Sequence, residues 1–491
     1  MQTPTRYVDV AVIGAGTAGQ VAFKKVLKNH ENTVIINNGF WTTTCATVGC
    51  MPSKLLIAAA HRASYAMHSE EFGVSGDIQI DGKAVMARVQ RERDRFTSFI
   101  TQQVERWDDN KTIDGIAKLV GKDENGHILI SVNEELISAK KLIIATGSTP
   151  FVPDEWKNLG ERVLTSDTVF ELTDLPKTLA VIGTGAIGLE LAQAMAKLGV
   201  TVKLFNRQAK VGGISDEALN AIAIDVLANN PNTPTLELLL NVKIDGLTLS
   251  EDGEQISVDY QDLQGSKQRF SADRVLLAIG RKTHLASLGV QSIDVEIDER
   301  GNPKNVNPKT GQVGDSNVYI IGDANGILPL MHVASDEGYN AGSVVCGDGN
   351  SDLVFQRVPM AITFTEPNIC QVGENLPTLN AMQDKGELQF VTGRVNFSNQ
   401  GRSRVMGVNM GQMHIYAHKD NGKILGASMI APDGEYLTHL LALAIDNGLT
   451  AKKMLEMPFY HPTIVEALRT CLRDVERQLH IEFIPNEKLT P

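Results

Sequence analysis

Short apolar runs separated by glycine and polar turns organise the first half of the chain. Residues 8–13 predict a buried strand, followed by a glycine-rich turn and a helix with apolar periodicity. Residues 34–36 predict the next strand, which completes a β-α-β unit. Residues 179–205 repeat this order of strand, glycine-rich turn, helix and strand. The pattern therefore predicts an α/β fold with two Rossmann-like nucleotide-binding domains.

The remaining segments predict a mixture of helices and strands. Residues 53–109 are expected to be mostly helical, including an amphipathic segment at 85–107, and the proline-bearing residues 150–156 are expected to be a linker. Further buried strands are predicted at residues 141–145, 275–279 and 318–321. From about residue 353 onward, alternating strands at 412–417 and 423–429 mix with helices and no glycine-rich turn occurs. This region predicts a third domain of α+β type.

Length, charge and cysteine content narrow the class of protein. A chain of 491 residues is too long for one hydrophobic core, so about three domains are expected. The formal net charge of −12 argues against a nucleic-acid or anionic-membrane partner. No apolar run reaches membrane-spanning length and no signal peptide is evident, so the cytoplasm is the expected compartment. The isolated cysteines, Cys346, Cys370 and Cys471, are expected to be inert.

Both glycine-rich turns have the spacing of dinucleotide sites. The first contains Gly14, Gly16 and Gly19, and the second contains Gly183, Gly185 and Gly188. Such a turn lets the backbone approach a pyrophosphate, which then lies at a helix N-terminus. A carboxylate that would bind ribose hydroxyls is missing after both turns, because Asn37 and Asn206 occupy those positions. Arg207 favours a 2′-phosphate, whereas Gly188 is typical of NAD sites, so both NAD and NADP remain open.

Cys45 and Cys50 are the strongest chemical signal in the chain. Two cysteines five residues apart at the start of a helix can close a small disulfide ring. The helix N-terminus and Lys54 both stabilise a thiolate, and a cysteine of lowered pKa exchanges readily with substrate thiols. Near the end of the chain, His461 and Glu466 have the spacing of a base and its orienting carboxylate. A dithiol elsewhere in the chain makes this pair a candidate for proton transfer during thiol exchange.

These motifs together resemble the class I pyridine nucleotide-disulfide oxidoreductases over residues 8–473. The resemblance implies an FAD-binding domain at residues 1–150 and 276–350, an NAD(P)-binding domain at 151–275, and a C-terminal dimerisation domain at 351–491. It also implies an enzyme that is an obligate homodimer. In that scheme Cys45 meets the substrate, Cys50 faces the flavin, Lys54 pairs with Glu190 beside the flavin, and His461 with Glu466 acts on the other subunit's disulfide.

The resemblance also assigns cofactor contacts. Those implied for FAD are Gly14, Gly16, Gly19, Asn37, Lys54, Ala117, Thr146, Gly147, Ser148, Gly322, Asp323, Leu330, Met331 and His332. Those implied for NAD(P) are Gly183, Gly185, Gly188, Glu190, Asn206, Arg207 and Gly280. A protein metal site is not expected.

Within the family the chain looks most like dihydrolipoamide dehydrogenase, as a divergent branch. The segment at residues 330–338 resembles the lipoamide-type pattern, whereas Thr47 departs from the usual asparagine within the cysteine ring. The implied reaction is oxidation of dihydrolipoamide, free or protein-bound, to lipoamide with NAD(P)+. The alternatives are an NADPH-dependent reductase of another small disulfide, a quinone or a metal ion, and a protein of another class, either a subunit that mainly docks within a 2-oxo acid dehydrogenase complex or a redox sensor with slow turnover.

Overall fold

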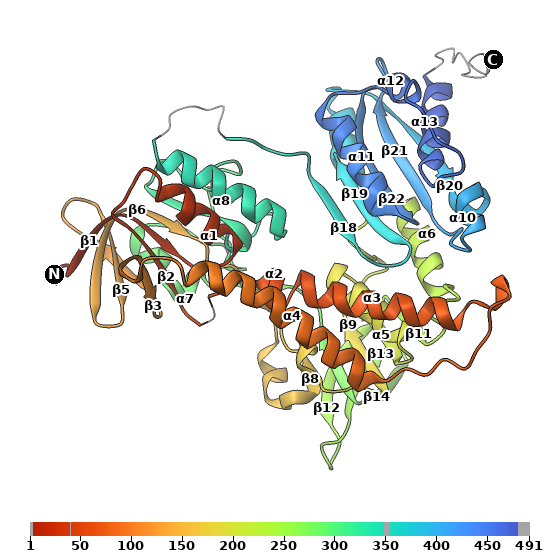
Figure 1. Ribbon diagram of the computed structural model, residues 1–491, viewed down its shortest axis with the longest axis horizontal. Helices are drawn as coiled ribbons and strands as arrows, with labels where there is room; N and C mark the ends of the chain where they lie inside the picture. Colours follow the sequence, from red (N-terminus) through yellow and green to blue (C-terminus); the bar gives the residue numbers. More distant parts are fainter. Residues whose placement is uncertain (1–2, 40, 348–353, 480–491) are drawn as a thin grey trace.

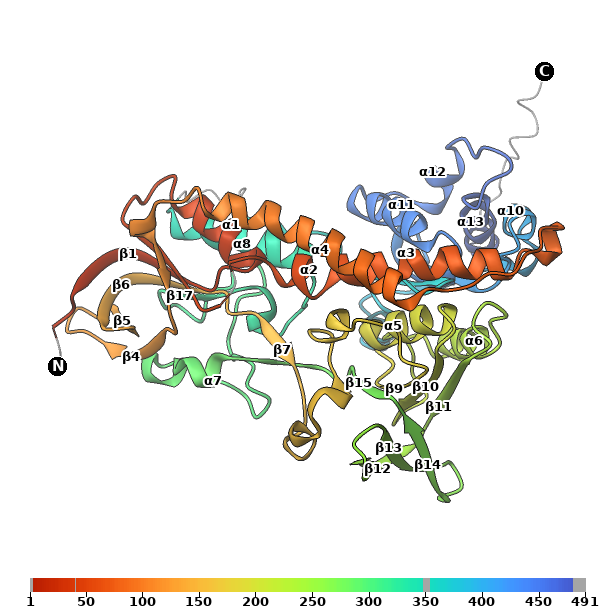
Figure 2. The same cartoon turned by 60° about the horizontal axis from the view of Figure 1, so that its bottom comes forward.

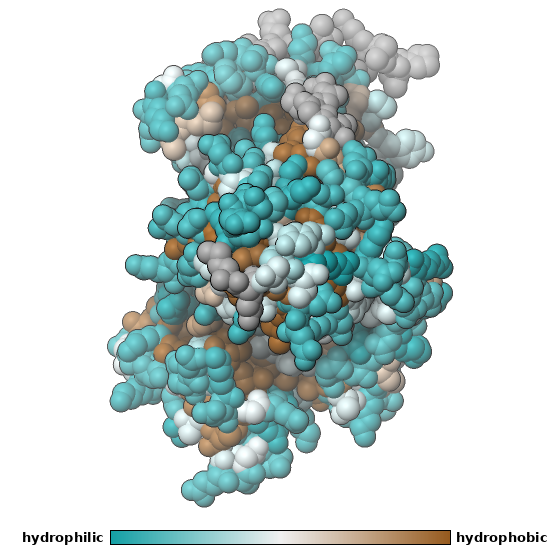
Figure 3. Space-filling view, turned by 90° about the vertical axis from the view of Figure 1, so that its left-hand side faces the viewer, coloured by the Kyte–Doolittle hydropathy of each residue, from teal (hydrophilic) through white to brown (hydrophobic). Residues whose placement is uncertain are grey.

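Three main sheets organise the computed structural model of the chain, which describes residues 3–39, 41–347 and 354–479. Figures 1 and 2 show one sheet near the N-terminus, a second in the middle of the sequence and a third towards the C-terminus. Seen from the end that carries the first sheet, most of the surface is hydrophilic, with hydrophobic side chains in smaller areas between (Figure 3). Among the described residues, no helix is long and apolar enough to cross a membrane.

The first sheet has the strand order β3-β2-β1-β6-β5-β4, and β17 also pairs with β6. Its strands are β1 (Arg6–Ile13), β2 (Thr33–Asn37), β3 (Thr112–Asp114), β4 (Lys118–Lys122), β5 (Ile128–Val132), β6 (Glu135–Ile144) and β17 (Val318–Ile320). β1 lies parallel to β2 on one side and to β6 on the other. Successive side chains of a strand point to opposite faces, so Val10 and Val12 enter one core while Ala11 and Ile13 enter another.

Two helices far apart in sequence cover one face of this sheet: α1 (Thr17–Val26) and α8 (Met331–Val345) (Figure 1). They approach closely because α8 has glycine at the crossing, where a Cβ on Gly338 would lie 2.4 Å from the Ala18 carbonyl oxygen. The other face packs against the short helices α7 (Leu285–Leu288) and η5 (Val290–Ile293). Residues after the second glycine-rich unit therefore return to complete the first sheet.

The second sheet is parallel throughout, with the order β11-β10-β9-β15-β8. Its strands are β8 (Val163–Leu164), β9 (Thr178–Ile182), β10 (Thr201–Asn206), β11 (Leu236–Leu240) and β15 (Arg274–Leu277). Helices α5 (Ala186–Lys197) and α6 (Glu217–Ala228) contribute to the core on one face. The opposite face is covered by an antiparallel sheet made of β12 (Lys243–Leu249), β13 (Ile256–Gln261) and β14 (Lys267–Ala272).

Two long helices, α3 (Cys50–Met67) and α4 (Gly82–Val104), pack against each other and join the core of the second sheet (Figure 2). Leu56 and Ala60 of α3 and Met86 of α4 are fully buried there. This packing matters for function because it brings the N-terminus of α3 beside α5. The short antiparallel pair β7 (Ser148–Pro150) and β16 (Arg281–Thr283) connects the first and second sheet regions.

The third sheet is antiparallel, with the order β18-β19-β22-β21-β20. Its strands are β18 (Met360–Thr363), β19 (Asn368–Gly373), β20 (Phe390–Asn396), β21 (Gln412–His418) and β22 (Ile424–Ala431). The helices of this region are α9 (Leu376–Asp384), α10 (Gly401–Val405), α11 (Gly434–Asp446), α12 (Ala451–Leu455) and α13 (Glu466–Gln478). The amphipathic helix α13 buries Ala467, Leu468 and Cys471 against the sheet.

The structure confirms the fold class predicted from the sequence, with two nucleotide-binding-type sheets and a C-terminal α+β region. Some predicted elements have different limits. The expected helical stretch at 53–109 consists of α3 and α4, and the residues between them contain only the short 3-10 segment η1 (Glu70–Phe72). The expected linker at 150–156 leads into the 3-10 segment η3 (Asp154–Arg162). The expected domain limits remain predictions, and the boundary at 350/351 lies outside the described residues.

Candidate active site

The paired cysteines lie where two helices begin. Cys45 belongs to the single-turn helix α2 (Thr44–Thr47), and the Thr43 hydroxyl caps α2 by accepting a hydrogen bond from the Ala46 N–H at 3.3 Å. Cys50 is the first residue of α3, directly after Gly49. Both cysteines are free thiols, and Cys50 is exposed while Cys45 is half-buried. The loop therefore presents two adjacent thiols at the N-terminus of an 18-residue helix.

The two thiols have different acidities. A hydrogen bond from the Cys45 thiol, aided by the Lys54 charge, lowers the pKa of Cys50 to about 7. The same hydrogen bond, together with burial, raises the pKa of Cys45. The unpaired N–H groups at the start of α3 add a partial positive charge beside Cys50. Cys50 is consequently the thiol that is stabilised as a thiolate, and Cys45 is its hydrogen-bond donor.

Lys54 lies one helical turn after Cys50 and pairs with a carboxylate from the second sheet region. Its ammonium is 2.7 Å from the Glu190 Oε2 atom and 4.4 Å from the centre of the Phe364 ring. The other Glu190 oxygen accepts a hydrogen bond from the Phe364 backbone N–H at 2.8 Å. The structure therefore brings together Lys54 and Glu190, as the family resemblance implies, close after Cys50 on α3, and adds Phe364 from the C-terminal region.

The first glycine-rich turn joins β1 to α1. Any Cβ on Gly14 would lie 2.3 Å from the Ala145 carbonyl oxygen, and one on Gly19 would lie 1.8 Å from the Gly14 carbonyl oxygen. Gly14 also has a φ of 104°, a conformation that favours glycine. By contrast, a Cβ on Gly16 would meet nothing within 4 Å. Two glycines are thus required by packing, while the third leaves open space at the N-terminus of α1.

The second glycine-rich turn, between β9 and α5, has nearly the same geometry. A Cβ on Gly183 would lie 2.3 Å from the Ala278 carbonyl oxygen, and one on Gly188 would lie 1.9 Å from the Gly183 carbonyl oxygen. The space around Gly185 is open. Each turn therefore leaves an open cradle at a helix N-terminus, which is the kind of position where backbone N–H groups can bind a phosphate.

The asparagines that follow the two turns have different roles. The Asn37 side chain accepts a hydrogen bond from the Ala15 N–H at 3.0 Å, so it closes onto the first turn. The Asn206 side chain donates instead to the Gln208 carbonyl at 2.8 Å and holds the loop after β10. Arg207 beside it is exposed. The predicted ribose positions are thus occupied by amides, one facing its turn and one facing the next loop.

A second group of predicted cofactor residues lies between the first sheet and the β7–β16 pair. The Ser148 hydroxyl donates to Asp323 at 2.7 Å, and the Arg281 guanidinium donates to the Ser148 hydroxyl at 2.8 Å and to its carbonyl at 2.7 Å. Gly147, with a φ of 64°, precedes this network. The Thr146 hydroxyl is buried with no hydrogen-bond partner among the described residues. A buried polar atom of this kind implies an external partner.

The remaining residues that are predicted to contact a cofactor lie at separate points of the fold. Ala117 is buried in the core of the first sheet, just before β4. Gly280 is exposed, immediately before β16. Leu330 is the N-cap residue of α8, and Met331 and His332 are its first two residues, both exposed. The N-terminus of α8 therefore presents these side chains to the surroundings.

His461 and Glu466 form a hydrogen-bonded pair at the start of α13. The His461 Nδ1 atom is 3.1 Å from the Glu466 Oε2 atom, and the Thr463 N–H donates to the same oxygen at 3.1 Å. The Glu466 carboxylate is largely buried, whereas the His461 side chain is 80% exposed. Figures 1 and 2 both show α13 well apart from α2, so a single chain does not bring this histidine to its own cysteine pair.

The sequence did not single out several polar residues that support the site. Glu337, buried in α8, accepts hydrogen bonds from the Gly322 N–H at 2.6 Å and from the Asn325 amide at 2.9 Å. Burial raises the pKa of this carboxyl. The sequence also did not single out Arg281 or the apolar residue Phe364. Arg281 follows a predicted nucleotide glycine, which was a usable signal, but Glu337 and Phe364 act through backbone contacts that no local motif reveals.

The isolated cysteines differ clearly from the pair. Cys370 and Cys471 are buried, and burial raises the pKa of Cys370 to about 12 and that of Cys471 further. Cys346 is half-buried and lies 3.7 Å from the Lys25 carbonyl oxygen. The surroundings of Cys370 and Cys471 favour the protonated thiol. Among the described residues, no group of three or more His, Cys, Asp or Glu side chains could hold a metal ion.

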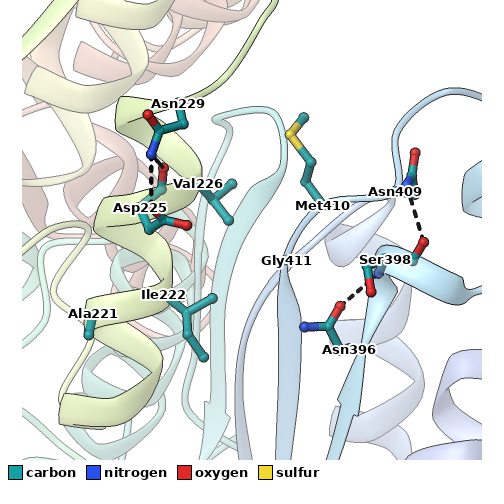
Figure 4. A pocket seen from close by; sticks show the side chains of 10 residues that line it. All are labelled: Ala221, Ile222, Asp225, Val226, Asn229, Asn396, Ser398, Asn409, Met410 and Gly411. Atoms are coloured by element: carbon teal, nitrogen blue, oxygen red, sulfur yellow. Dashed lines mark hydrogen bonds between the residues drawn. The ribbon is translucent and has the colours of Figure 1, made fainter.

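A separate cleft of about 530 Å³ lies between α6 and the C-terminal sheet (Figure 4). Ile222, Asp225 and Asn229 line one side, and Asn396 and Asn409 line the other. Their amides are engaged within the walls, since Asn229 donates to Asp225 at 2.8 Å and Asn409 to the Ser398 carbonyl at 3.2 Å. The cleft contains none of the predicted site residues.

Fold and site together define a class of enzyme. Two dinucleotide-type turns, a dithiol at a helix start and a lysine–glutamate pair beside it are the parts of a nucleotide-dependent flavoprotein disulfide oxidoreductase.

The chain belongs to the pyridine nucleotide-disulphide oxidoreductase family. Residues 8–338 match the family itself, and residues 359–472 match its dimerisation domain. Members of this family use FAD and a nicotinamide nucleotide. The residues present fit these cofactors, because both turns leave open cradles at helix N-termini and the buried Thr146 hydroxyl lacks a partner in the described chain.

The chain is similar over most of its length to curated dihydrolipoyl dehydrogenases. The enzyme of Chlamydia pneumoniae is 30% identical, with 94% of this chain and 95% of that protein covered. The enzyme of Bacillus subtilis is 28% identical, with 93% and 94% covered. Among solved structures, LpdA from Mycobacterium tuberculosis is 23% identical, covers 95% of this chain and 99% of its own, and has a TM-score of 0.78.

The flavoprotein disulfide reductase RclA from Escherichia coli has a similar fold. It is 19% identical, with 96% of this chain and 99% of that chain covered, and the TM-score is 0.77. The resemblance to the family stated from the sequence is therefore confirmed. The roles of individual site residues stay predictions.

Proposed function

We propose that the chain oxidises a small dithiol, with dihydrolipoamide as the first candidate, and transfers the electrons to NAD(P)+. The observation that carries this proposal is the asymmetric thiol pair. The pKa of Cys50 is lowered to about 7, while that of Cys45 is raised. A disulfide between two such sulfurs has one good leaving group, because thiol–disulfide exchange favours departure of the more acidic thiol.

Each step then has a residue to perform it. A substrate thiolate attacks the Cys45 sulfur of the Cys45–Cys50 disulfide, and Cys50 leaves as a thiolate beside Lys54. The second substrate thiolate attacks the substrate sulfur of the mixed disulfide, which releases the oxidised cyclic substrate, and Cys45 departs as a thiolate that is then protonated. His461, oriented by Glu466, takes up the protons of the two substrate thiols one after the other, and one of them passes to the Cys45 thiolate while the other is released. The chain thereby gains the two electrons that the substrate loses.

The cofactor sites fit the same scheme. The first turn, Asn37 and the network around Asp323 would hold FAD, and the second turn with Arg207 would hold the nicotinamide nucleotide. Bound there, FAD would supply the two-electron chemistry that links the thiol pair to the nicotinamide. Lys54 and Glu190 would lie beside the flavin, and their ion pair neutralises the charge of each side chain and orients both.

The proposal includes a homodimer. Residues 359–472 match the family's dimerisation domain, and the His461 side chain is 80% exposed. Because α13 lies apart from α2 in one chain, a second copy is needed to bring a histidine to each cysteine pair (Figures 1 and 2). Membership of a 2-oxo acid dehydrogenase complex would add a protein-bound form of the same dithiol as substrate.

A second candidate is an NADPH-dependent reductase of another small disulfide, a quinone or a metal ion. The exposed Arg207 and the absence of a carboxylate at Asn206 favour this alternative, because a guanidinium binds a 2′-phosphate. The reaction would use the same thiol pair in the opposite direction. The substrate, the nucleotide and the direction of electron flow would differ from those of the first candidate.

The test is the initial rate of NAD+ and NADP+ reduction by dihydrolipoamide on FAD-loaded protein, compared with Cys45→Ser and with the control Cys346→Ser. We expect rapid turnover in the parent and control proteins, and loss of turnover with retained flavin in Cys45→Ser. Full dithiol activity in Cys45→Ser would exclude the thiol-pair mechanism. No turnover of dihydrolipoamide by the parent, with NADPH-driven reduction of another disulfide, would establish the second candidate.

A further inference from the structure

One face of α5 carries three buried polar side chains: Glu190, Gln193 and Lys197. Their spacing places them on the same side of the helix, and their exposed fractions are 6%, 3% and 1%. The segment between β18 and β19, which contains Phe364 and Glu366, crosses this face. Buried polar groups are costly unless they are hydrogen-bonded, so the partners of these side chains are informative.

The first two side chains bind the backbone of the crossing segment. Glu190 accepts from the Phe364 N–H at 2.8 Å. The Gln193 amide accepts from the Glu366 N–H at 2.7 Å and donates to the Glu366 carbonyl at 3.1 Å. Because Phe364 and Glu366 are alternate residues, one helix face satisfies both N–H groups, and the Gln193 amide determines the register of the segment along α5.

The Glu366 side chain binds residues of both α5 and α3. Its carboxylate forms an ion pair with the buried Lys197 and accepts a hydrogen bond from the Tyr65 hydroxyl of α3. His61 of α3 lies 3.8 Å from the same carboxylate. The Asn230 amide also donates to the Glu366 carbonyl, at 2.8 Å. The crossing segment is therefore held against both α3 and α5, one to three helical turns beyond Lys54 and Glu190.

We propose that Gln193 is a positioning residue for the Lys54–Glu190 pair. By holding the Glu366 backbone, it keeps the Phe364 N–H on one Glu190 oxygen, so that the other oxygen stays on Lys54. The Lys54 charge is then partly neutralised, and this sets how strongly Lys54 stabilises the Cys50 thiolate. The inference deepens the proposed function and depends on it, since it assigns a residue that acts on the redox thiol only through Lys54 and Glu190.

The direction of the effect follows from the charges around Cys50. Cys45 and Lys54 favour its thiolate, and Glu190 opposes it. If Gln193 no longer holds the segment, Glu190 loses its fixed second contact and neutralises Lys54 less. Lys54 then stabilises the Cys50 thiolate more strongly. Replacement of Gln193 should therefore shift the Cys50 titration in the same direction as Glu190→Gln, but by less.

The experiment is the pH dependence of Cys50 alkylation by iodoacetamide in the reduced, FAD-loaded protein. Fragmentation of the labelled peptide by mass spectrometry separates Cys50 from Cys45. In Gln193→Met we expect the midpoint to fall by about 0.5 pH unit, which is roughly a threefold gain in thiolate at pH 6. Should Gln193→Met fail to fold, Gln193→Ala replaces it with the same expectation, because it also removes both the acceptor for the Glu366 N–H and the donor to the Glu366 carbonyl.

Asn340→Leu is the matched control. Asn340, on α8, is also 3% exposed, and its amide donates to the Lys309 and Phe355 carbonyls at 3.0 and 2.8 Å. This control should leave the Cys50 midpoint unchanged. In a Glu190→Gln background, Gln193→Met should add no shift, because no carboxylate remains to be positioned.

An unchanged midpoint in folded Gln193→Met, or an equal shift in the Glu190→Gln background, would overturn the inference. These outcomes are separate from failure of the proposed function, which would appear as full dithiol turnover in Cys45→Ser. A chain with normal thiol-pair turnover and an unshifted Gln193→Met midpoint would refute only the positioning role.

Discussion

The two glycine-rich turns have almost the same backbone but different surroundings. In the first, the Gly14 N–H donates to the Ile36 carbonyl at 2.8 Å, and in the second the Gly183 N–H donates to the Phe205 carbonyl at 2.8 Å. The two packing glycines of each turn make equivalent close approaches, and the middle glycine of each leaves open space. The backbone of such a turn thus specifies a phosphate cradle without specifying which nucleotide occupies it.

The two turns differ in the helices that follow them, since α1 and α5 carry different side chains at equivalent positions. On α1, Val21 lies against Gly338 of α8, where a Cβ added to that glycine would come within 3.1 Å of its side chain. On α5, the equivalent position is Glu190, which reaches Lys54. One helix therefore makes a close, small-residue contact within its own sheet unit. The other carries buried polar groups to the dithiol and to the C-terminal region.

The largest expected effect is the loss of a different cofactor when the middle glycine of each turn is replaced. Gly16→Val and Gly185→Val should both fold, because neither position has a neighbour within 4 Å of a new Cβ. A larger side chain should nevertheless exclude a pyrophosphate from each cradle. Gly16→Val should lose bound FAD, whereas Gly185→Val should keep FAD and lose reduction by NAD(P)H. Flavin absorbance after gel filtration and anaerobic titration with both nucleotides measure this. Loss of flavin from Gly185→Val would contradict the assignment of the turns.

The next effect concerns stability. Lys197, at the end of α5, is 1% exposed and paired with Glu366. Removing one partner of a buried ion pair leaves an uncompensated charge, so Lys197→Met should lower the free energy of unfolding by about 3–5 kcal/mol. Lys28 occupies the equivalent position after α1 and is exposed, so Lys28→Met should change stability by less than about 0.5 kcal/mol. Urea denaturation of both variants checks this, and equal losses would refute the difference between the helices.

A smaller effect concerns the acidity of Cys50. Since its pKa is lowered to about 7, its alkylation rate should rise between pH 6 and 8 and then level off. Lys54→Met removes a positive charge that favours the thiolate, so the midpoint should move upward, by about one pH unit. A downward shift or no shift would show that α5 and Lys54 do not act on this thiol.

The smallest predicted effect concerns nucleotide preference at the second turn. Arg207→Ala should raise the KM for NADP(H) about tenfold, about 1.4 kcal/mol, and leave the KM for NAD(H) nearly unchanged. FAD affinity, which depends on the first turn, should not change. Steady-state kinetics with both nucleotides measure the difference. An equal change with both nucleotides would mean that Arg207 does not contact a 2′-phosphate.

Local motifs predicted much of the site. The spacing of the glycines identified both cradles, since a Cβ at four of the six positions would collide with backbone. The five-residue spacing of His461 and Glu466 corresponds to an observed contact of 3.1 Å between them. These features were readable because their geometry is set within a few residues of chain or within one repeated β-α-β unit.

Contacts across sheets could not be read in the same way. Gln193 gave no signal as an uncharged residue in an apolar helix, yet it binds the backbone of Glu366, which is 173 residues away. Glu337 likewise meets Gly322 only because α8 packs beside the first sheet. Backbone N–H groups do not depend on the residue type, so no side-chain pattern indicates which of them a distant polar residue will bind.

The sequence by itself determined the fold class and the close backbone approaches of the two glycine-rich turns, and it placed Lys54 one helical turn after Cys50, because glycine stereochemistry and short spacings act locally. Only the tertiary structure decided that α3 packs beside α5 and that the segment after β18 crosses both helices. It also left His461 exposed and apart from the thiols of its own chain. These arrangements depend on how apolar faces from distant segments are buried together, and that is a property of the whole chain.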